Sequence, residues 1–96
     1  MSDIEFKRGM LLLTLQDAGT IYGLRFQVRY DLEVNGQTLT DHKGKPITYV
    51  VDATYMRDGA RVYEDSKAGD FIEDLSRLKI AVFEASRGIR VLIPKS

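Results

Sequence analysis

The chain has 96 residues, enough for one domain with a single core, and its formal net charge is zero. The absence of cysteine excludes disulfides, thiolate chemistry and cysteine-ligated zinc, and a single histidine does not supply a ββα-metal nuclease. No apolar run approaches the roughly 20 residues of a membrane span. We expect a cytoplasmic protein without membrane association, since the N-terminus lacks the pattern of a secretory signal.

The first element is predicted as a helix over residues 4–18. Ser2 is placed as its N-cap, with Glu5 three residues later in the position of a capping box, and Gly19 is placed to end it. Gly9 inside this helix weakens it by roughly 1 kcal/mol. Three leucines supply the apolar face: Leu11, Leu12 and Leu15.

A long stretch over residues 24–34 alternates apolar and polar side chains, which is the pattern of a strand with one buried face. The apolar positions predicted to face the core are Leu24, Phe26, Val28, Tyr30, Leu32 and Val34. Asn35-Gly36 is a turn signal that closes this strand. Residues 41–46 form a polar connection in which His42 is expected to be exposed.

Two short strands follow, over residues 47–55 and 61–67, and they are joined through Asp58-Gly59. Asp-Gly between two β-rich runs is a strong signal for a two-residue hairpin turn. The resulting register pairs Arg57 with Ala60, Tyr55 with Val62 and Asp52 with Asp65. The last pair brings two carboxylates face to face, with Cβ atoms about 5 Å apart. Like charges in this position are destabilising, so the pair predicts a cation or a proton between them.

A second helix is predicted to begin at Asp70, with Glu73 completing its cap, and to end at Gly88. Its inward stripe is predicted as Phe71, Leu75, Leu78 and Val82. A last strand over residues 89–93 should return parallel to the strand that precedes the helix. The chain is therefore predicted to be one α+β (α/β) domain over residues 1–96. Its order is helix, three strands, helix and strand, with the helices packed on a central mixed sheet.

The facing aspartates and Lys67 have the composition of a metal site for phosphodiester hydrolysis. Mg²⁺ binds oxygen ligands through one or two carboxylates together with water and substrate phosphate, and Mn²⁺ is its usual substitute. Lys67 lies two residues beyond Asp65 and on the same face of the strand. It either pairs with an aspartate as a structural residue or offsets the charge that builds on the phosphate. Its ordinary pKa of about 10.4 favours an electrostatic role over proton abstraction.

Glu64 is the alternative to Asp65 as metal ligand. In a regular strand the two adjacent side chains point to opposite faces, so only one of them can share a face with Asp52. A bulge would exchange them, and the choice stays open, with Asp65 preferred.

The pattern resembles the PD-(D/E)xK nuclease superfamily, which has an aspartate on one strand, a (D/E)xK motif on the next strand and then a helix. More narrowly, three stretches are similar to a family of small phage-encoded domains in that superfamily: residues 49–55, 62–69 and 78–89. Members of that family carry an upstream helix motif, Ser-x-x-Glu-x-x-Arg, and end that helix in Ala-Gly. This chain has Ser2, Glu5, Arg8 and Ala18-Gly19 at the matching spacing. It departs from the pattern at Val51, where proline is common, and at Asp65, where glutamate is commoner.

The resemblance implies a restriction-endonuclease-like core and Mg²⁺-dependent hydrolysis of DNA. The implied catalytic residues are Glu5, Asp52, Asp65 and Lys67, and the implied metal ligands are Asp52, Asp65 and Glu5. Glu5 keeps its competing role as a helix cap. The resemblance also implies that Gln27 and Lys79 make auxiliary contacts to the substrate. The pattern of residues alone predicts that both side chains are exposed to solvent.

The implied partner is DNA, in linear, nicked or branched form, in phage recombination or replication within the cytoplasm of a host cell. A homodimer is expected, because one domain of this size presents little surface to hold a duplex. The main alternative is a catalytically inactive module of the same fold that binds DNA or a protein. A third hypothesis is a small α+β domain of unrelated function, in which the acidic pair is a coincidence.

Overall fold

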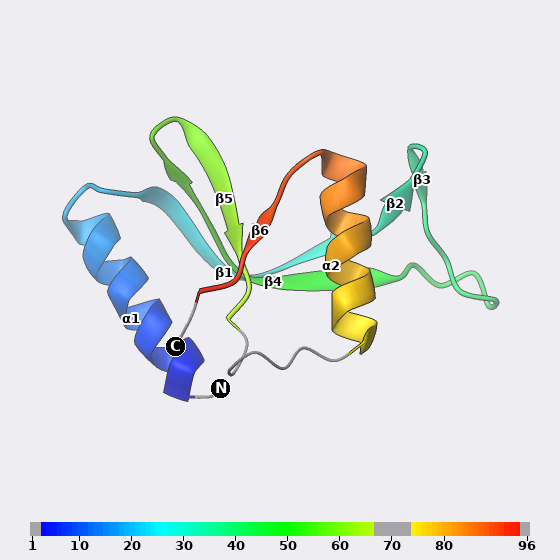
Figure 1. The fold of residues 1–96 in the computed structure, drawn as a ribbon, viewed down its shortest axis with the longest axis horizontal. Helices are drawn as coiled ribbons and strands as arrows, with labels where there is room; N and C mark the ends of the chain where they lie inside the picture. The colour runs from blue at the N-terminus through cyan, green and yellow to red at the C-terminus, as the bar shows by residue number, and fades with distance from the viewer. Residues whose placement is uncertain (1–2, 67–73, 95–96) are drawn as a thin grey trace.

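The computed structural model describes residues 3–66 and 74–94, with side chains from residue 6 onward. Within these residues the chain forms an α+β fold with two helices and a mixed four-stranded sheet (Figure 1). The helices are α1 (Asp3–Asp17) and α2 (Asp74–Arg87). The strands are β1 (Tyr22–Asp31), β2 (Glu33–Val34), β3 (Gln37–Thr38), β4 (Thr48–Arg57), β5 (Ala60–Glu64) and β6 (Val91–Leu92). The predicted fold class is confirmed.

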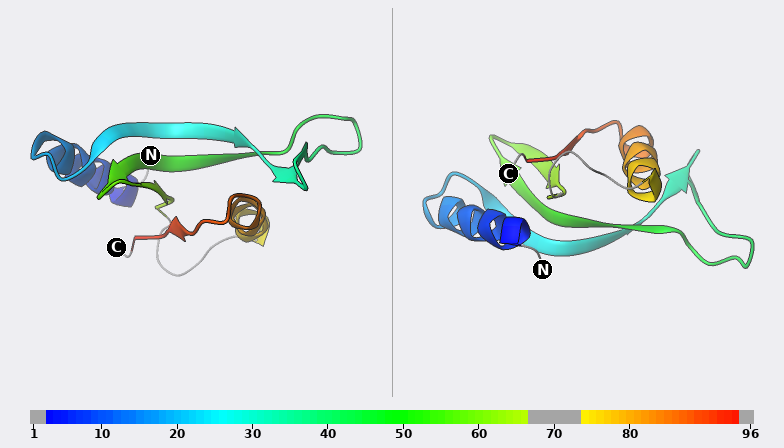
Figure 2. Two further views of the ribbon diagram at one scale, coloured as in Figure 1. Left: turned by 90° about the horizontal axis from the view of Figure 1, so that it is seen from above. Right: turned by 60° about the horizontal axis from the view of Figure 1, so that its bottom comes forward.

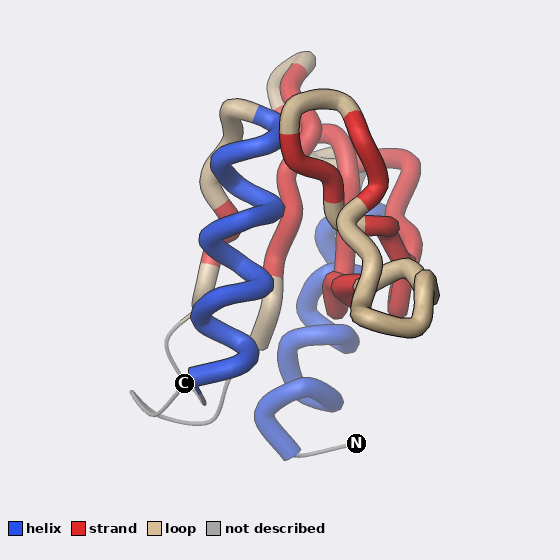
Figure 3. Tube along the Cα trace, turned by 90° about the vertical axis from the view of Figure 1, so that its right-hand side faces the viewer, coloured by secondary structure: helices blue, strands red, loops and turns tan. Residues whose placement is uncertain are grey.

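The main sheet has the strand order β1-β4-β5-β6. Its first two pairings are antiparallel, whereas β5 and β6 are parallel, as predicted for a strand, helix and strand in succession. Figure 2 shows β1 and β4 as a long curved ribbon, with α1 near one end of it. The helix α1 packs against β1, and α2 packs against β2 and β4, so that α2 runs along one side of the strands (Figure 3). Neither described helix has the length and apolar character needed to cross a membrane.

The β4–β5 hairpin has the register that the sequence predicts. The two turn residues have φ angles of 52° and 80°, the left-handed values that a type I′ turn requires. The pairs run from Arg57 with Ala60 beside the turn to Ala53 with Glu64 at the far end. The two aspartates that were predicted to face each other therefore lie one position beyond the last pair of the ladder.

The prediction of one strand over residues 24–34 is wrong at its C-terminal end. After β1 ends, the Leu32 N–H donates to the Ile47 carbonyl at 2.9 Å, and the next two residues pair with β3 instead. Val34 therefore lies in a two-stranded hairpin outside the main sheet and is 47% exposed. The predicted alternation holds for four residues that are buried or half-buried: Leu24, Val28, Tyr30 and Leu32.

The core is divided into two clusters, one against each helix. The cluster against α2 consists of Leu32, Tyr49, Val51, Tyr63, Ile80, Phe83 and Val91. The cluster against α1 consists of Leu12, Ile21, Ala53 and Tyr55. In the first cluster the Phe83 ring lies 5.2–5.3 Å from the rings of three tyrosines, in tilted and edge-on contacts that aromatic pairs favour: Tyr30, Tyr49 and Tyr63.

The face that α2 turns toward the core differs from the predicted one. Ile80 and Phe83 are buried and Val82 packs against the same cluster, whereas Leu75 and Leu78 are each 62% exposed. The predicted inward stripe is therefore confirmed at Val82 and wrong at Leu75 and Leu78. The reason is tertiary, because the rotation of the helix follows the fit of the Phe83 ring among the tyrosines. Four predicted cap and stripe residues lie outside the described residues: Ser2, Asp70, Phe71 and Glu73.

Replacing Gly9 by alanine is expected to stabilise the protein by about 0.5–1 kcal/mol. Gly9 lies inside α1, and a Cβ atom added to it would lie 3.7 Å from the Phe26 ring, an ordinary van der Waals distance. Urea unfolding measures the change, with Gly36→Ala as the opposite control because Gly36 has a φ of 77°. A destabilising effect of Gly9→Ala would show that α1 packs more tightly on β1 than described.

Candidate functional site

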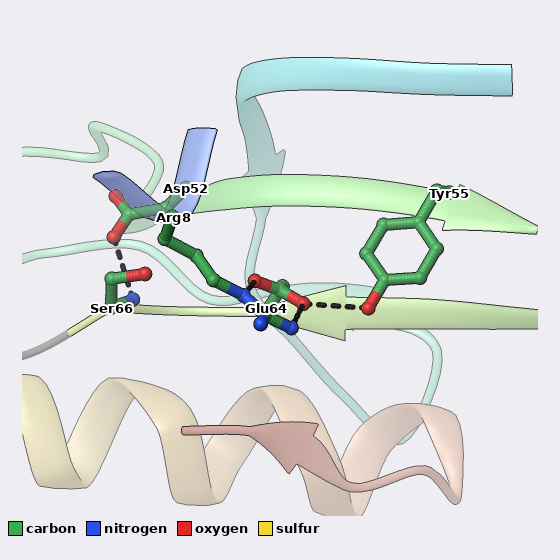
Figure 4. Close-up of polar contacts among 5 residues, drawn as sticks. All are labelled: Arg8, Asp52, Tyr55, Glu64 and Ser66. Carbon is green, nitrogen blue, oxygen red and sulfur yellow. Dashed lines mark hydrogen bonds and ion pairs between the residues drawn. The ribbon is translucent and has the colours of Figure 1, made fainter. Parts of the chain in front are cut away.

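Asp52 lies on β4 next to the end of the β4–β5 ladder. Its half-buried carboxylate accepts a hydrogen bond from the Ser66 backbone N–H at 2.8 Å on Oδ2 (Figure 4) and one from Gln27 Nε2 at 3.4 Å on Oδ1. A cavity of about 200 Å³ lies beside it, lined by residues of α1, β1, β4 and β5. The candidate site is therefore open to a ligand on the side of α1.

Gln27 lies opposite Asp52 on β1 and has an unusual backbone. Its φ of 53° is in the left-handed region, which costs a residue other than glycine about 1–2 kcal/mol. Regular pairs flank this position, Phe26 with Ala53 and Val28 with Val51, so the irregularity is confined to one residue. Strain of this kind persists only where the surrounding structure imposes it. It is found here at the one position on β1 whose side chain binds Asp52.

Glu64 points toward α1 and is engaged by three donors. Arg8 donates from Nε to Oε1 at 2.8 Å and from Nη2 to Oε2 at 2.9 Å, and the Tyr55 hydroxyl donates to Oε2 at 2.6 Å (Figure 4). Glu64 is 1% exposed, so this bidentate ion pair is largely shielded from water on the carboxylate side. Burial and the bond to Glu64 raise the pKa of Tyr55 to about 12, and the same carboxylate raises the pKa of Arg8. Both Glu64 oxygens are therefore occupied by donors of the protein.

Asp65 is fully buried and points toward the cluster against α2. Its Oδ2 accepts a hydrogen bond from the Tyr49 hydroxyl at 2.7 Å, and its backbone N–H donates to the Leu92 carbonyl on β6 at 3.0 Å. Burial, the bond to Asp65 and the charges of Asp65 and Asp52 raise the pKa of Tyr49 above its usual range. Ser66, whose backbone N–H donates to Asp52, is the next residue after Asp65.

The structure describes only part of the remaining residues that were predicted for the site. Lys67 lies outside the described residues, and Glu5 lies in α1 three positions before Arg8 with its side chain outside them. Lys79 is half-buried on α2 and does not line the cavity beside Asp52. The structure thus brings Asp52 and Gln27 together at the cavity, places Asp65 in the core against Tyr49, and leaves Lys79 away from the cavity.

The oxygen ligands of this site suit a hard divalent cation. Among the side chains that the structure describes, no group of three acidic or histidine residues is close enough to hold a metal ion. Two carboxylates are sufficient for Mg²⁺ when water and a substrate phosphate complete its coordination. The Tyr49 hydroxyl and the Ser66 N–H are outer partners of the kind that orient ligating carboxylates. Asp52 lines the open cavity and Asp65 is fully buried, so the described side chains supply oxygen atoms of the kind that Mg²⁺ binds but form no closed protein cage.

Sequence reasoning missed two features of this site. The ion pair between Arg8 and Glu64 joins residues 56 positions apart, and the left-handed backbone of Gln27 occurs within an ordinary polar strand position. The only signal in the sequence for the ion pair was the Ser-x-x-Glu-x-x-Arg motif that contains Arg8.

Comparisons of the chain with protein-family models, with curated proteins and with solved structures find no match.

Alkaline unfolding is expected to set in between about pH 10 and pH 12. The pKa of Tyr55 is raised from 10.0 to about 12 in the folded protein, so folding favours the neutral phenol. The contribution of Tyr55 to the free energy of unfolding is complete below the pKa that Tyr55 has in the unfolded chain. It is lost as the pH rises through the pKa that Tyr55 has in the folded protein. Urea unfolding across this pH range measures the loss of stability, and the decrease of the free energy of unfolding with pH should be smaller in Tyr55→Phe. An equal slope in wild type and variant would contradict the assignment.

Proposed function

We propose that this protein is a Mg²⁺-dependent DNA endonuclease with a restriction-endonuclease-like core. The observation that supports it best is that Asp52 and Asp65 each lie one position beyond Ala53 and Glu64, the last pair of the β4–β5 ladder, and that Asp52 lines an open cavity. Two negative charges balance one divalent cation. The third carboxylate of this region, Glu64, is already neutralised by Arg8 and leaves that balance undisturbed.

Each of the candidate residues has a defined part in this proposal. Asp52 and Asp65 would hold Mg²⁺, which when bound polarises a scissile phosphate and lowers the pKa of an attacking water. Tyr49 keeps the Asp65 carboxylate oriented through its hydrogen bond, and Ser66 does the same for Asp52. Lys67 follows Asp65 by two residues and offsets the negative charge that develops on the phosphate.

Gln27 and Glu5 have supporting parts. The Gln27 amide is held beside Asp52 and is directed to the substrate or to a water at the metal. Arg8 joins α1 to the hairpin through its ion pair with Glu64, and Glu5 lies on the same helix. This position supports a role for Glu5 as a further acidic group that reaches the metal from the side of α1.

Cleavage of labelled DNA tests the proposal. Linear, nicked and four-way-junction substrates are incubated with Mg²⁺, Mn²⁺ or EDTA at low salt, so that phosphate contacts are not screened. Wild type and the control Asp31→Asn, an exposed aspartate at the far end of β1, should cleave only with metal. Lys67→Ala should be slower by about 10²–10³-fold. Absence of cleavage by folded wild type on all three substrates would refute the nuclease.

The second candidate is a non-catalytic DNA- or protein-binding module. The full burial of Asp65 favours it, because a carboxylate that is satisfied by Tyr49 serves a structural purpose without metal. This alternative predicts DNA or protein binding that EDTA does not change, together with no cleavage under any metal. The same assays distinguish the two functions.

A further inference from the structure

The outer edge of β1 is open to a further strand. Among the residues that the structure describes, β1 has a single neighbour in the main sheet, which is β4. An edge strand presents unpaired N–H and C=O groups, and it pairs with another chain unless irregularities or repelling charges prevent this. The first part of β1 is irregular, because its register shifts between Tyr22 and Arg25 and its backbone is left-handed at Gln27. Residues 28–31 pair with β4 without interruption and form the regular part of the edge.

The backbone groups of Arg29 and Asp31 face this edge. In an antiparallel pair, residues alternate between those that bond to the neighbouring strand and those that do not. The Leu32 N–H donates to the Ile47 carbonyl on the side of β4, and the register is regular from there back to residue 28. The N–H and C=O groups of Arg29 and Asp31 therefore point away from β4. A strand added at this edge would form its hydrogen bonds with these two residues.

The side chains of the same two residues carry opposite charges. Both are exposed, and neither forms an ion pair with another described side chain. Suppose that a second β1 is added in the antiparallel direction. A register that places Arg29 opposite Arg29, or Asp31 opposite Asp31, brings like charges face to face, which is destabilising. The register between these two places each arginine opposite the aspartate of the other copy and has its two-fold axis at Tyr30.

We propose that two copies of this chain pair through residues 28–32 of β1 in that register, so that their main sheets join into one. The inference goes beyond the proposed nuclease function and does not rest on it. The same surface serves both copies, as in other two-fold dimers. The Tyr30 rings of the two copies meet at the axis, and cross-strand aromatic pairs are favourable. Each ring is already held in place, because it packs 5.2 Å from the Phe83 ring of its own chain.

The occupant of the edge is a second copy rather than an unrelated strand. A partner has to present an acidic and a basic residue in the reverse order along an antiparallel strand, and a copy related by a two-fold axis does so by symmetry. The contact is short, so we expect a weak dimer that exchanges with the monomer. None of the residues 28–32 lines the cavity beside Asp52, so that cavity stays open in the dimer and hydrolysis there does not depend on the pairing.

Sedimentation equilibrium from micromolar to millimolar protein tests the inference, at low salt so that the charges are not screened. The variants are Arg29→Asp and Asp31→Arg, measured separately and mixed in equal amounts. Arg57→Asp is the matched control, because it makes the same change of charge at an exposed position beside the β4–β5 turn. Circular dichroism establishes that each variant is folded.

Wild type and Arg57→Asp should dimerise alike. Each of the other two variants should dimerise at least about tenfold more weakly, because it places like charges opposite each other on both sides of the axis. The mixture should recover the affinity of wild type, since a strand with two acidic residues then faces a strand with two basic ones. The double variant Arg29→Asp/Asp31→Arg should dimerise with itself, which decides the matter if a single variant does not fold.

A wild type that stays monomeric over the whole range would overturn the inference. A dimer of unchanged affinity in Arg29→Asp and Asp31→Arg would place the contact on another surface and overturn it as well. So would a mixture that associates no more tightly than the separate variants.

Discussion

Arg8→Met is expected to lower the free energy of unfolding by about 3 kcal/mol, because it leaves the buried Glu64 carboxylate without its counter-ion. The side chain of Arg8 is 24% exposed and that of Glu64 is 1% exposed, so the loss should lie at the lower end of the range for buried pairs. In a domain of this size the melting temperature should fall by more than about 10 °C. Thermal and urea unfolding at neutral pH measure both quantities.

The double variant Arg8→Met/Glu64→Leu is the matched control. Replacing both partners by apolar residues of similar volume removes the unpaired charge, and stability should return close to that of wild type. The remaining cost comes from the Tyr55 hydroxyl, which loses its acceptor. If the double variant is as unstable as Arg8→Met, packing of the arginine stem rather than the charge of Glu64 carries the effect.

Asp52→Asn is expected to abolish the stabilisation of the protein by divalent metal and to slow cleavage by about 10³-fold or more. Asparagine has the shape of aspartate and keeps an acceptor for the Ser66 N–H, so the fold should persist. At a metal concentration one hundred times the dissociation constant, wild type should gain about 2.7 kcal/mol of stability. Asp52→Asn should gain nothing, and without metal it should be at least as stable as wild type, since repulsion from Asp65 is reduced.

Thermal unfolding in Mg²⁺, Mn²⁺ and EDTA measures this effect, with Asp31→Asn as the control for the loss of one surface charge. The control should respond to metal as wild type does. A metal response that survives in Asp52→Asn would place the ion elsewhere on the protein. A wild type that does not respond to either metal would contradict the two-aspartate site.

The hairpin that carries the candidate site could be predicted from sequence because its determinants are local. Asp58-Gly59 supplies the left-handed residues of a type I′ turn, and the turn then determines the pairing along both strands. This register also predicted a pairing of Asp52 with Asp65, and both residues lie one position beyond the last pair of the observed ladder. The helix α1, its end at Gly19 and the parallel return of β6 were accessible for the same reason, because each depends on signals within a few residues.

The parts that could not be predicted depend on tertiary contacts. Leu75 and Leu78 have the spacing of a core stripe, but the fit of Phe83 among three tyrosines rotates them into solvent. Glu64 reads as an ordinary strand carboxylate until α1 brings Arg8 against it. The left-handed conformation of Gln27 has no local signal, since neither glycine nor asparagine marks it, and it occurs where the Gln27 side chain binds Asp52 on the neighbouring strand.

The most direct measurement of the central claim is the location of Mn²⁺ by paramagnetic broadening of backbone amide signals. A metal held by Asp52 and Asp65 should broaden the amides of Ser66 and Gln27 at low Mn²⁺ and leave the β2–β3 hairpin sharp, and Mg²⁺ should reverse the effect by competition. The same titration of Asp52→Asn should leave these amides sharp. Broadening that is absent from Ser66, or unchanged in Asp52→Asn, would contradict the metal site from which the nuclease function is argued.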